Sequence, residues 1–369
     1  MKELEQEIKK FRKTSLQSNG SERDYLLDEL RKDEYKNEWF RSAIVRDFLN
    51  EFVADSRFVP KVISNAIESS KQEVESLGIG ELARQKFLDT IDGNGRLKEL
   101  RKYTISANDL ISSARNEGKV MKTFAERNIH NSRYYFTKFT EWYITQCYIH
   151  EYDQPTIVDI GSAYNGFGMY AKNTTDAREI NLVDILNPPG RFEIEDRVIQ
   201  VGSDAAKIDS VPNEHAEIVC LHNAIEHFAC GSDDGCLREI QRMLRPGGKA
   251  LITPFFFEGR YAISLNPISC FFYGSSYDVF VDYIINEYSQ RGANIRYSYG
   301  MISPYAHLYD YPTIERKLQS NCPALKPSLY QVRLKMEELD FNEVFGVKFS
   351  EDLYQKPTFF FLVLEKPDR

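Results

Sequence analysis

The strongest constraint on the fold is a glycine-rich turn that directly follows a mainly apolar run. The run covers residues 157–160, and Gly161, Gly166 and Gly168 lie in the segment that comes next. Glycine permits a tight turn and lets the backbone approach a ligand closely. A strand that leads through such a turn into a helix is how an α/β sheet builds a nucleotide site, although a glycine pattern by itself is weak evidence.

Two further predicted strands end in carboxylates. Residues 179–184 end at Asp184, which lies 23 positions after Gly161. In nucleotide-binding α/β units an acid about 20 residues beyond the turn accepts hydrogen bonds from ribose hydroxyls. Residues 197–205 form a strand that ends near Asp204. Its carboxylate can accept a hydrogen bond from an exocyclic amine such as that of adenine.

A fourth strand and a helix complete the pattern. The strand begins at residue 216 and runs into a loop that carries His222, Glu226 and His227. Ligands of open α/β sheets bind at the carboxyl ends of the strands, so these side chains are expected to face a substrate. The helix spans about residues 233–244, and Pro246 with the two glycines that follow it marks its end before a strand at 249–254.

The alternation of strands and helices predicts an α/β protein with a doubly wound, mostly parallel sheet. Residues 151–369 are expected to form this domain, and its last two strands are predicted at 342–349 and 358–364. Residues 1–150 carry apolar side chains at helical spacing and predict a helical N-terminal domain or cap. An aromatic-rich insertion at about 255–305 fits a substrate lid or wall.

The order of these features resembles the class I S-adenosylmethionine-dependent methyltransferases. It is most similar to the large group in which a Glu-His pair precedes an Arg-x-Leu-x-Pro-Gly-Gly turn. The pair is matched by Glu226 and His227, and the turn by residues 242–248. The resemblance covers about residues 155–366 and implies a Rossmann-like sheet of seven strands with the last one antiparallel. Segments 257–261 and 307–312 also look like a bacterial subgroup associated with surface-glycan synthesis.

The resemblance implies S-adenosyl-L-methionine as the cofactor and assigns residues to it. Gly161, Gly166 and Gly168 would border its methionine part, Asp184 would bind the ribose, and Asp204 the adenine. The remaining residues expected to contact the cofactor are Asp159, Ser162, Ala205 and His222. For Asp204 the alternative is a cap or an Asx-turn at the strand exit, which is a common role for aspartate.

The candidates for catalysis follow from what methyl transfer demands. The cofactor brings the reactive group, and an alcohol acceptor must also lose its proton. His227 is the expected base because histidine ordinarily titrates near neutrality. Packing of His227 against the following helix is the alternative. Glu226 is expected to contact substrate or orient His227, and His222 is a weaker candidate that can instead line the cofactor pocket.

The expected acceptor is a small polar molecule or a sugar or glycan, methylated on oxygen. Four residues beyond the Gly-Gly turn are expected to bind it, because Tyr and Arg combine apolar area with directed donors. These residues are Arg260, Tyr261, His307 and Tyr309. The alternative for them is an ordinary surface loop.

Composition narrows the remaining possibilities. The net charge of −8 with no long basic run disfavours nucleic acid as a partner. The first residues lack the apolar core of a signal peptide, no stretch has the length of a membrane span, and six cysteines without a recognisable framework suit a reducing compartment. We therefore expect a cytoplasmic protein. The spacing of Cys230 and Cys236 is not a zinc pattern, so no metal is expected, and an oligomer is compatible with the sequence.

Two other classes of function remain open. A non-catalytic adaptor or regulatory protein that keeps the methyltransferase fold is suggested by Ala163, which stands where a second glycine is common in the turn. Absence of S-adenosylmethionine binding would favour it. A nicotinamide-dependent oxidoreductase shares the sheet and the turn, but Glu226 and His227 argue against it. Titration with the reduced nicotinamide cofactor distinguishes that class.

Overall fold

The computed structural model describes ten segments of the chain, which form two compact units. The segments are residues 87–91, 94–106, 109–110, 113, 132–162, 166–228, 231–265, 294–297, 305–335 and 360–368. The larger unit comprises the described parts of 91–256 and 312–369, and the smaller unit those of 1–90 and 257–311. Residues 1–86 of the helical domain expected at 1–150 lie outside the described residues.

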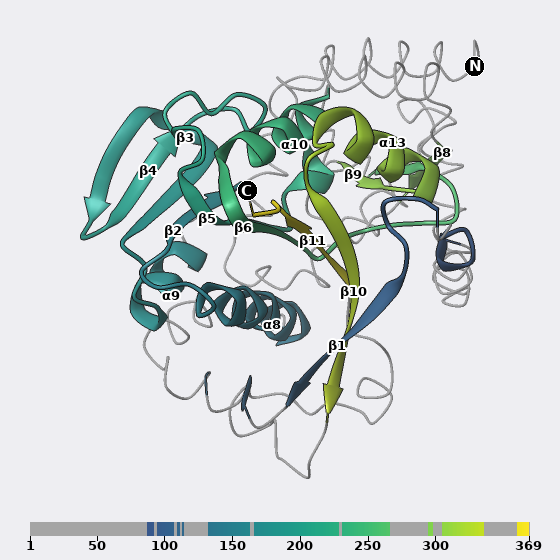
Figure 1. Ribbon diagram of the computed structural model, residues 1–369, viewed down its shortest axis with the longest axis horizontal. Helices are drawn as coiled ribbons and strands as arrows, with labels where there is room; N and C mark the ends of the chain where they lie inside the picture. Colours follow the sequence, from purple (N-terminus) through teal and green to yellow (C-terminus); the bar gives the residue numbers. More distant parts are fainter. Residues whose placement is uncertain are drawn as a thin grey trace, which may run out of the picture. The chain divides into compact units, whose positions relative to one another are not determined.

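The larger unit is built on an eight-stranded sheet with the order β1-β10-β11-β6-β5-β2-β3-β4 (Figure 1). The strands are β1 (Leu100–Ser106), β2 (Thr156–Ile160), β3 (Glu179–Glu195), β4 (Val198–Gly202), β5 (Ala216–His222), β6 (Leu244–Thr253), β10 (Lys326–Lys335) and β11 (Phe360–Glu365). On one side of β2 the strands follow in chain order as β3 and then β4, and on its other side they follow as β5 and then β6. The order therefore reverses between β2 and β5, which is where doubly wound sheets bind ligands.

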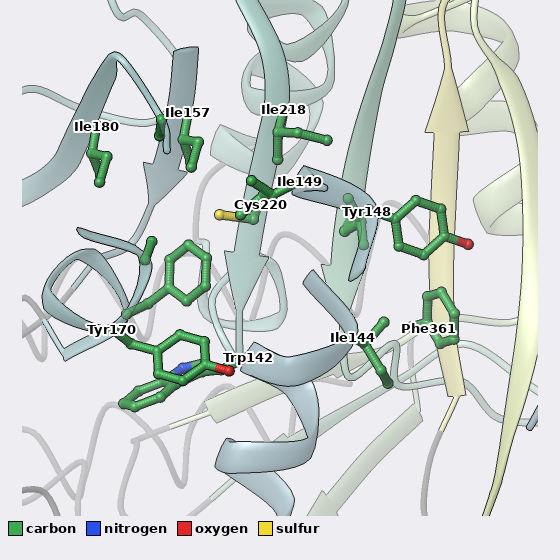
Figure 2. Close-up of a cluster of buried hydrophobic side chains, with 14 of the residues drawn as sticks. Trp142, Ile144, Tyr148, Ile149, Ile157, Tyr170, Ile180, Ile218, Cys220 and Phe361 are labelled. Atoms are coloured by element: carbon green, nitrogen blue, oxygen red, sulfur yellow. The ribbon is translucent and has the colours of Figure 1, made fainter. Parts of the chain in front are cut away.

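Helices cover both faces of this sheet (Figure 1). One face carries α8 (Ser132–Ile149) and α9 (Gly166–Thr174), and the other carries α10 (Ser232–Met243) and α13 (Tyr311–Asn321). Figure 2 shows Trp142 of α8 and Tyr170 of α9, whose rings lie 5.5 Å apart, within the buried cluster that also holds Ile157 and Ile218 from the sheet. Two helices thus bury their apolar side against the strands that carry the glycine turn.

The start of α10 follows from its sequence. Asp233 and Asp234 lie in its first turn, where negative charge is favourable, and Leu237, Ile240 and Met243 are buried along one side. Lys317 of α13 lies 2.7 Å from Asp233 and 2.8 Å from Asp234, and its side chain is almost fully buried. This ion pair joins the two helices on their shared face of the sheet.

Two expectations about the fold require correction. The described sheet has eight strands rather than seven, because β1 pairs in parallel with β10. β1 comes from the region expected to be helical, and α8 packs on the sheet, so the described residues of 91–150 belong to the larger unit rather than to a separate domain. Tyr103 explains the placement of β1, since its ring packs against Tyr148 and Phe361 in the core.

The antiparallel final strand is confirmed. β11 pairs antiparallel with both β6 and β10. The second strand of this pair is β10, which the sequence did not indicate, and the expected strand at 342–349 lies outside the described residues. In the smaller unit β7 (Ala262–Leu265), β8 (Asn294–Tyr297) and β9 (Tyr305–Leu308) form a three-stranded sheet, of which β7 and β8 lie within the expected insertion and β9 begins at its end. Among the described residues, no helix combines the length and the apolar character needed to cross a membrane.

Candidate active site

The glycine turn lies at the carboxyl end of β2, next to the point where the strand order reverses. Gly161 has a φ of +73°, and a Cβ atom there would lie 2.6 Å from the Cβ of Ala224. Both the left-handed backbone and the close approach exclude a larger residue. Glycine is therefore required at this position by its own backbone conformation and by the Ala224 side chain of the β5 loop, before any ligand is considered.

Gly168 lies against β3, and its place beside the cofactor stays a prediction. A Cβ atom at Gly168 would lie 2.6 Å from Cδ2 of Leu182, so the absence of a side chain lets α9 pack closely on β3. Close packing of the helix on the strand is one of the recognised uses of such glycines. Gly166 begins α9, and residues 163–165 lie outside the described residues.

Asp184 and Asp204 follow neighbouring strands at the same edge of the sheet. Oδ1 of Asp184 accepts a hydrogen bond of 2.9 Å from the amide of Leu186, and Oδ1 of Asp204 accepts one of 2.8 Å from the amide of Ala206. Both are Asx-turns, which was the alternative considered for Asp204. Asp204 is exposed and Ala205 is half-buried. The structure therefore brings the two carboxylates to the carboxyl edge, each with one oxygen already used in its own turn.

His222 is held by contacts to both of its ring nitrogens. Nδ1 lies 3.4 Å from Oδ1 of Asp159, and Nε2 lies 3.0 Å from the hydroxyl of Thr145 on α8. The ring also packs on Phe167, with 4.4 Å between centroids. These contacts hold the ring in place and engage both nitrogens, which makes His222 the least suitable of the candidate bases.

Asp159 also accepts a hydrogen bond of 3.6 Å from the thiol of Cys220. Burial and the neighbouring Asp159 raise the pKa of Cys220 well above its ordinary value, so the thiol keeps the proton that it donates. One ligating atom from each of Asp159, Cys220 and His222 lies within 4.8 Å of the others, which is a set of residue types that metals use. In this protein Cys220 and His222 each pair with Oδ1 of Asp159 through a hydrogen bond. Asp159 is buried, and both of these hydrogen bonds join it to β5.

Glu226 and His227 lie in the short 3-10 helix η3 (Ile225–His227) just after β5. Oε1 of Glu226 lies 3.5 Å from Nε2 of His227. The Glu226 side chain is 3% exposed and that of His227 is 32% exposed. Burial raises the pKa of Glu226, and the nearby His227 opposes that rise. The pair combines a buried carboxylate with a solvent-accessible imidazole, the arrangement in which a charge on one favours a charge on the other.

Within the described residues, three buried side-chain atoms at this edge have no hydrogen-bond partner. They are Oγ of Ser162 after β2, Oε2 of Glu226 after β5, and Oγ1 of Thr253 at the end of β6. Buried polar atoms are normally paired, and an unpaired one costs about 1–3 kcal/mol. Atoms that stay unpaired in the protein alone can be paired by a bound molecule. The residues present therefore fit a polar ligand seated across the ends of β2, β5 and β6.

A buried polar network on α8 completes the site and was missed in the sequence. Both carboxylate oxygens of Glu141 accept hydrogen bonds from the amide nitrogen of Asn223, at 3.0 and 2.9 Å, and Lys138 lies 3.1 Å from the same carboxylate. Asn223 has a φ of +51°, and it leads directly into the turn before Glu226. The network thus holds the strained backbone that positions η3.

A signal for this network was present in the sequence. Lys138, Glu141 and Thr145 are spaced three and four residues apart within an aromatic-rich helix, so they share one side of it. Polar residues at that spacing on a helix that packs against a sheet indicate buried partners.

The four residues expected to bind the acceptor lie in the smaller unit. The hydroxyl of Tyr261 lies 2.7 Å from Nδ1 of His307, and the rings of His307 and Tyr309 stack at 5.6 Å. All three rings are buried, whereas Arg260 is exposed. The three aromatic residues therefore form the core of the small sheet in the structure. Their binding of an acceptor stays a prediction.

An open depression of about 660 Å³ lies at the opposite edge of the large sheet. Its lining residues are 150–153, which precede β2, and 173–176, which precede β3. It is a polar hollow at the amino ends of the strands. The carboxyl edge, where the candidate residues lie, is a separate region.

Residues 168–252 match the family model described as a methyltransferase domain. This segment includes Asp184, Asp204 and the η3 pair, together with β3 to β6. No curated protein matches the chain.

Solved structures with weak similarity to the chain include methyltransferases. The 1,6-didemethyltoxoflavin-N1-methyltransferase of Burkholderia thailandensis is 14% identical with a TM-score of 0.37, and the match covers 69% of this chain and 91% of that one. A methyltransferase in complex with the Trm112 activator of Haloferax volcanii is 10% identical with a TM-score of 0.39, covering 70% and 98%. The geranyl diphosphate C-methyltransferase of Streptomyces coelicolor is 13% identical with a TM-score of 0.33, covering 62% and 80%.

Proposed function

We propose that this protein methylates a hydroxyl group of a small polar acceptor. The premise is that the chain carries a class I S-adenosylmethionine-dependent methyltransferase domain and is an enzyme that uses this cofactor. A sugar or glycan is the acceptor class that we favour. The observation that carries the proposal is the buried carboxylate of Glu226, which has an unpaired oxygen and lies beside His227 at the carboxyl edge of the matched domain.

The residues that would hold the cofactor follow the order of the strands. Gly161 permits the tight turn at the end of β2, Asp184 would accept hydrogen bonds from the ribose hydroxyls, and Asp204 one from the adenine amine. Ser162 has a buried hydroxyl without a hydrogen-bond partner in the described residues, which fits a contact to the methionine part. When bound, the cofactor supplies an electrophilic methyl group on a sulfonium.

Proton removal from the acceptor is assigned to His227. Its side chain is 32% exposed and so is open to a molecule that enters from solvent. The imidazole takes the hydroxyl proton as the oxygen becomes a nucleophile. The resulting positive charge faces Oε1 of Glu226, and that charge favours the ionised carboxylate, since His227 lowers the otherwise raised pKa of Glu226. The pair therefore gains interaction energy as the proton moves.

The remaining residues would hold the reacting groups in place. Glu141 and Asn223 hold the turn before η3, so the distance between Glu226 and His227 depends on α8. Thr253 has a buried hydroxyl that lacks a hydrogen-bond partner at the end of β6, where it can contact the acceptor. Oriented groups in a dry site contribute to rate by fixing the reacting atoms before the step.

Calorimetry with S-adenosylmethionine and its demethylated product tests the cofactor step directly. Micromolar binding, roughly −8 kcal/mol, is expected for both. Sugars and nucleotide sugars are then screened with the radiolabelled methyl donor, and transfer to a hydroxyl supports the proposal. A folded protein that binds neither compound would favour the adaptor alternative. Binding with transfer only to amine acceptors would contradict O-methylation.

A further inference from the structure

The edge of the large sheet beyond β4 has an unusual construction. Residues 180–184 of β3 pair in parallel with β4, from Ile180 opposite Val198 to Asp184 opposite Gly202. The partner numbers then fall as the chain continues, with Arg191 opposite Val201 and Glu193 opposite Ile199. Residues 189–195 therefore return antiparallel along the outer side of β4. We call residues 185–195 the β3 arm, and Figure 1 shows it at the left margin of the sheet.

The β3 arm replaces the helix that usually joins two parallel strands. It leaves a strand at the edge of the sheet whose residues 188–196 are all exposed. The described residues contain four exposed large apolar side chains, and all four belong to the arm. They are Ile185, Leu186, Phe192 and Ile194, which are 72%, 81%, 50% and 43% exposed.

Edge strands of soluble proteins are normally protected. Lysine or proline in the strand, inward-pointing charges or a covering element prevent pairing with another chain. Pro188 and Pro189 protect only the start of the arm, and residues 190–195 have no lysine or proline and alternate charged and apolar residues from Arg191 on. Arg191 and Glu193 share one side, and Phe192 and Ile194 share the other. An open backbone edge with apolar side chains is suited to pairing with a further strand.

We propose that the β3 arm pairs antiparallel with the β3 arm of a second copy of this chain, around a two-fold axis at Phe192. In this register each Arg191 lies opposite Glu193 of the second copy, and the two Phe192 rings lie opposite each other. Opposite charges and aromatic pairs at directly facing positions stabilise antiparallel strands. The alternating charged and apolar residues of one arm therefore match those of a second arm, and a two-fold interface requires such a self-complementary surface.

The charge pattern is the reason for choosing a second copy as the occupant. The register at Phe192 brings two Arg-Glu pairs together and sets no like charges opposite each other. Lys172 of α9 lies 2.7 Å from Glu195, and Arg191 lies 2.8 Å from Glu179, so the charged side of the arm is already held in place by its own unit. A short arm buries limited area, so we expect a reversible dimer rather than an obligate one.

Analytical ultracentrifugation of the full chain over a concentration series tests this pairing. The chain has a mass of 42.9 kDa, and a reversible shift toward twice that mass is expected as concentration rises. Phe192→Lys and Glu193→Arg should each weaken the dimer at least tenfold, with unchanged circular dichroism and melting temperature because both positions are exposed. Ile185→Lys is the control, since it removes an apolar residue that is more exposed than Phe192 and lies outside residues 189–195, which pair in this register.

The double variant Arg191→Glu with Glu193→Arg restores opposite charges across the axis and should recover the dimer relative to Glu193→Arg. A wild type that stays monomeric at all concentrations would overturn the proposal. So would an association that Ile185→Lys weakens as much as Phe192→Lys does. A monomer that loses melting temperature in Phe192→Lys would also overturn it, since another part of the same chain would then cover the arm. The proposal is independent of methyl transfer.

Discussion

Two buried histidines in this protein lie in contrasting surroundings. His307 of the smaller unit contacts Tyr261 through a 2.7 Å hydrogen bond and stacks on Tyr309, so the polar atom and the rings pair with one another. His222 of the larger unit is also fully engaged, but the edge around it keeps unpaired oxygens on Ser162 and Glu226. The polar atoms of Tyr261 and His307 thus pair with each other, whereas oxygens of Ser162 and Glu226 have no hydrogen-bond partner among the described residues.

The contrast separates packing from function. A core whose polar atoms are paired gains stability from each contact, whereas an edge with unpaired buried oxygens gives up stability that a bound ligand can restore. Substitutions in the ring cluster of the smaller unit should therefore reduce stability. Substitutions at the carboxyl edge should reduce activity or ligand affinity and leave stability nearly unchanged, or even increase it.

The largest expected effect is on stability, from His307→Ala. The change removes a buried ring and leaves the Tyr261 hydroxyl without its partner, so the free energy of unfolding should fall by about 3 kcal/mol. Urea denaturation of the full chain measures the loss. Tyr261→Phe is the control, since it removes only the hydroxyl and should cost about 1 kcal/mol. Unchanged stability with a raised KM for the acceptor would instead favour the acceptor-binding prediction for His307.

The next effect is on turnover, from His227→Ala. A general base contributes about 10²- to 10⁴-fold, so kcat should fall at least about a hundredfold. Cofactor affinity and melting temperature should stay the same, because the His227 side chain is partly exposed and is not among the residues expected to hold the cofactor. Steady-state kinetics with calorimetry separates the two quantities. A fully active variant would remove His227 as the base and leave its packing role.

A smaller effect is expected on binding, from Asp184→Ala. Loss of the ribose hydrogen bonds should weaken S-adenosylmethionine by roughly 1–3 kcal/mol. Calorimetry reports this directly, and Asp184→Asn serves as the comparison because it keeps an acceptor oxygen for the Leu186 amide. If a folded alanine variant binds the cofactor with wild-type affinity, the ribose assignment is wrong.

The smallest effect is a gain in stability, from Glu226→Gln. Burial raises the pKa of Glu226, so the folded state binds a proton that the unfolded chain has already released, and this contribution is lost as pH rises through the folded pKa. Removing the charge should therefore stabilise the protein at pH 7 by about 1 kcal/mol, with no gain below pH 4. Melting curves at both pH values measure the difference while kcat falls. Equal destabilisation at both pH values would mean that the carboxylate is structural.

Much of the sheet could be predicted because its strands carry clear signals in their local sequence. The runs before Gly161 and Asp184 are apolar and short, and each ends in a turn residue. The helix expected at 233–244 occupies Ser232–Met243, with its acids in the first turn. Such signals depend on neighbours along the chain, and periodicity together with caps identifies them without knowledge of the fold.

The remainder depended on contacts between distant segments. β1 was expected to be helical, yet seven of its residues pair with β10, more than 200 positions away. The β3 arm was not foreseen, because nothing in residues 185–195 distinguishes an outer strand from a loop until β4 is beside it. Glu141 and Asn223 were missed for the same reason, as they meet only once α8 packs on the sheet.

By itself the sequence determined the class of the protein, since the glycine turn, the strand-end acids and the Glu-His pair are recognised by their order along the chain, without knowledge of the fold. Only the tertiary structure decided which of these side chains remain available for chemistry. It engaged both nitrogens of His222, stacked His307 within a core, and left an oxygen of Glu226 unpaired beside His227. Burial and pairing are set by the packing of distant segments, and they decide whether a polar group stabilises the fold or serves a ligand.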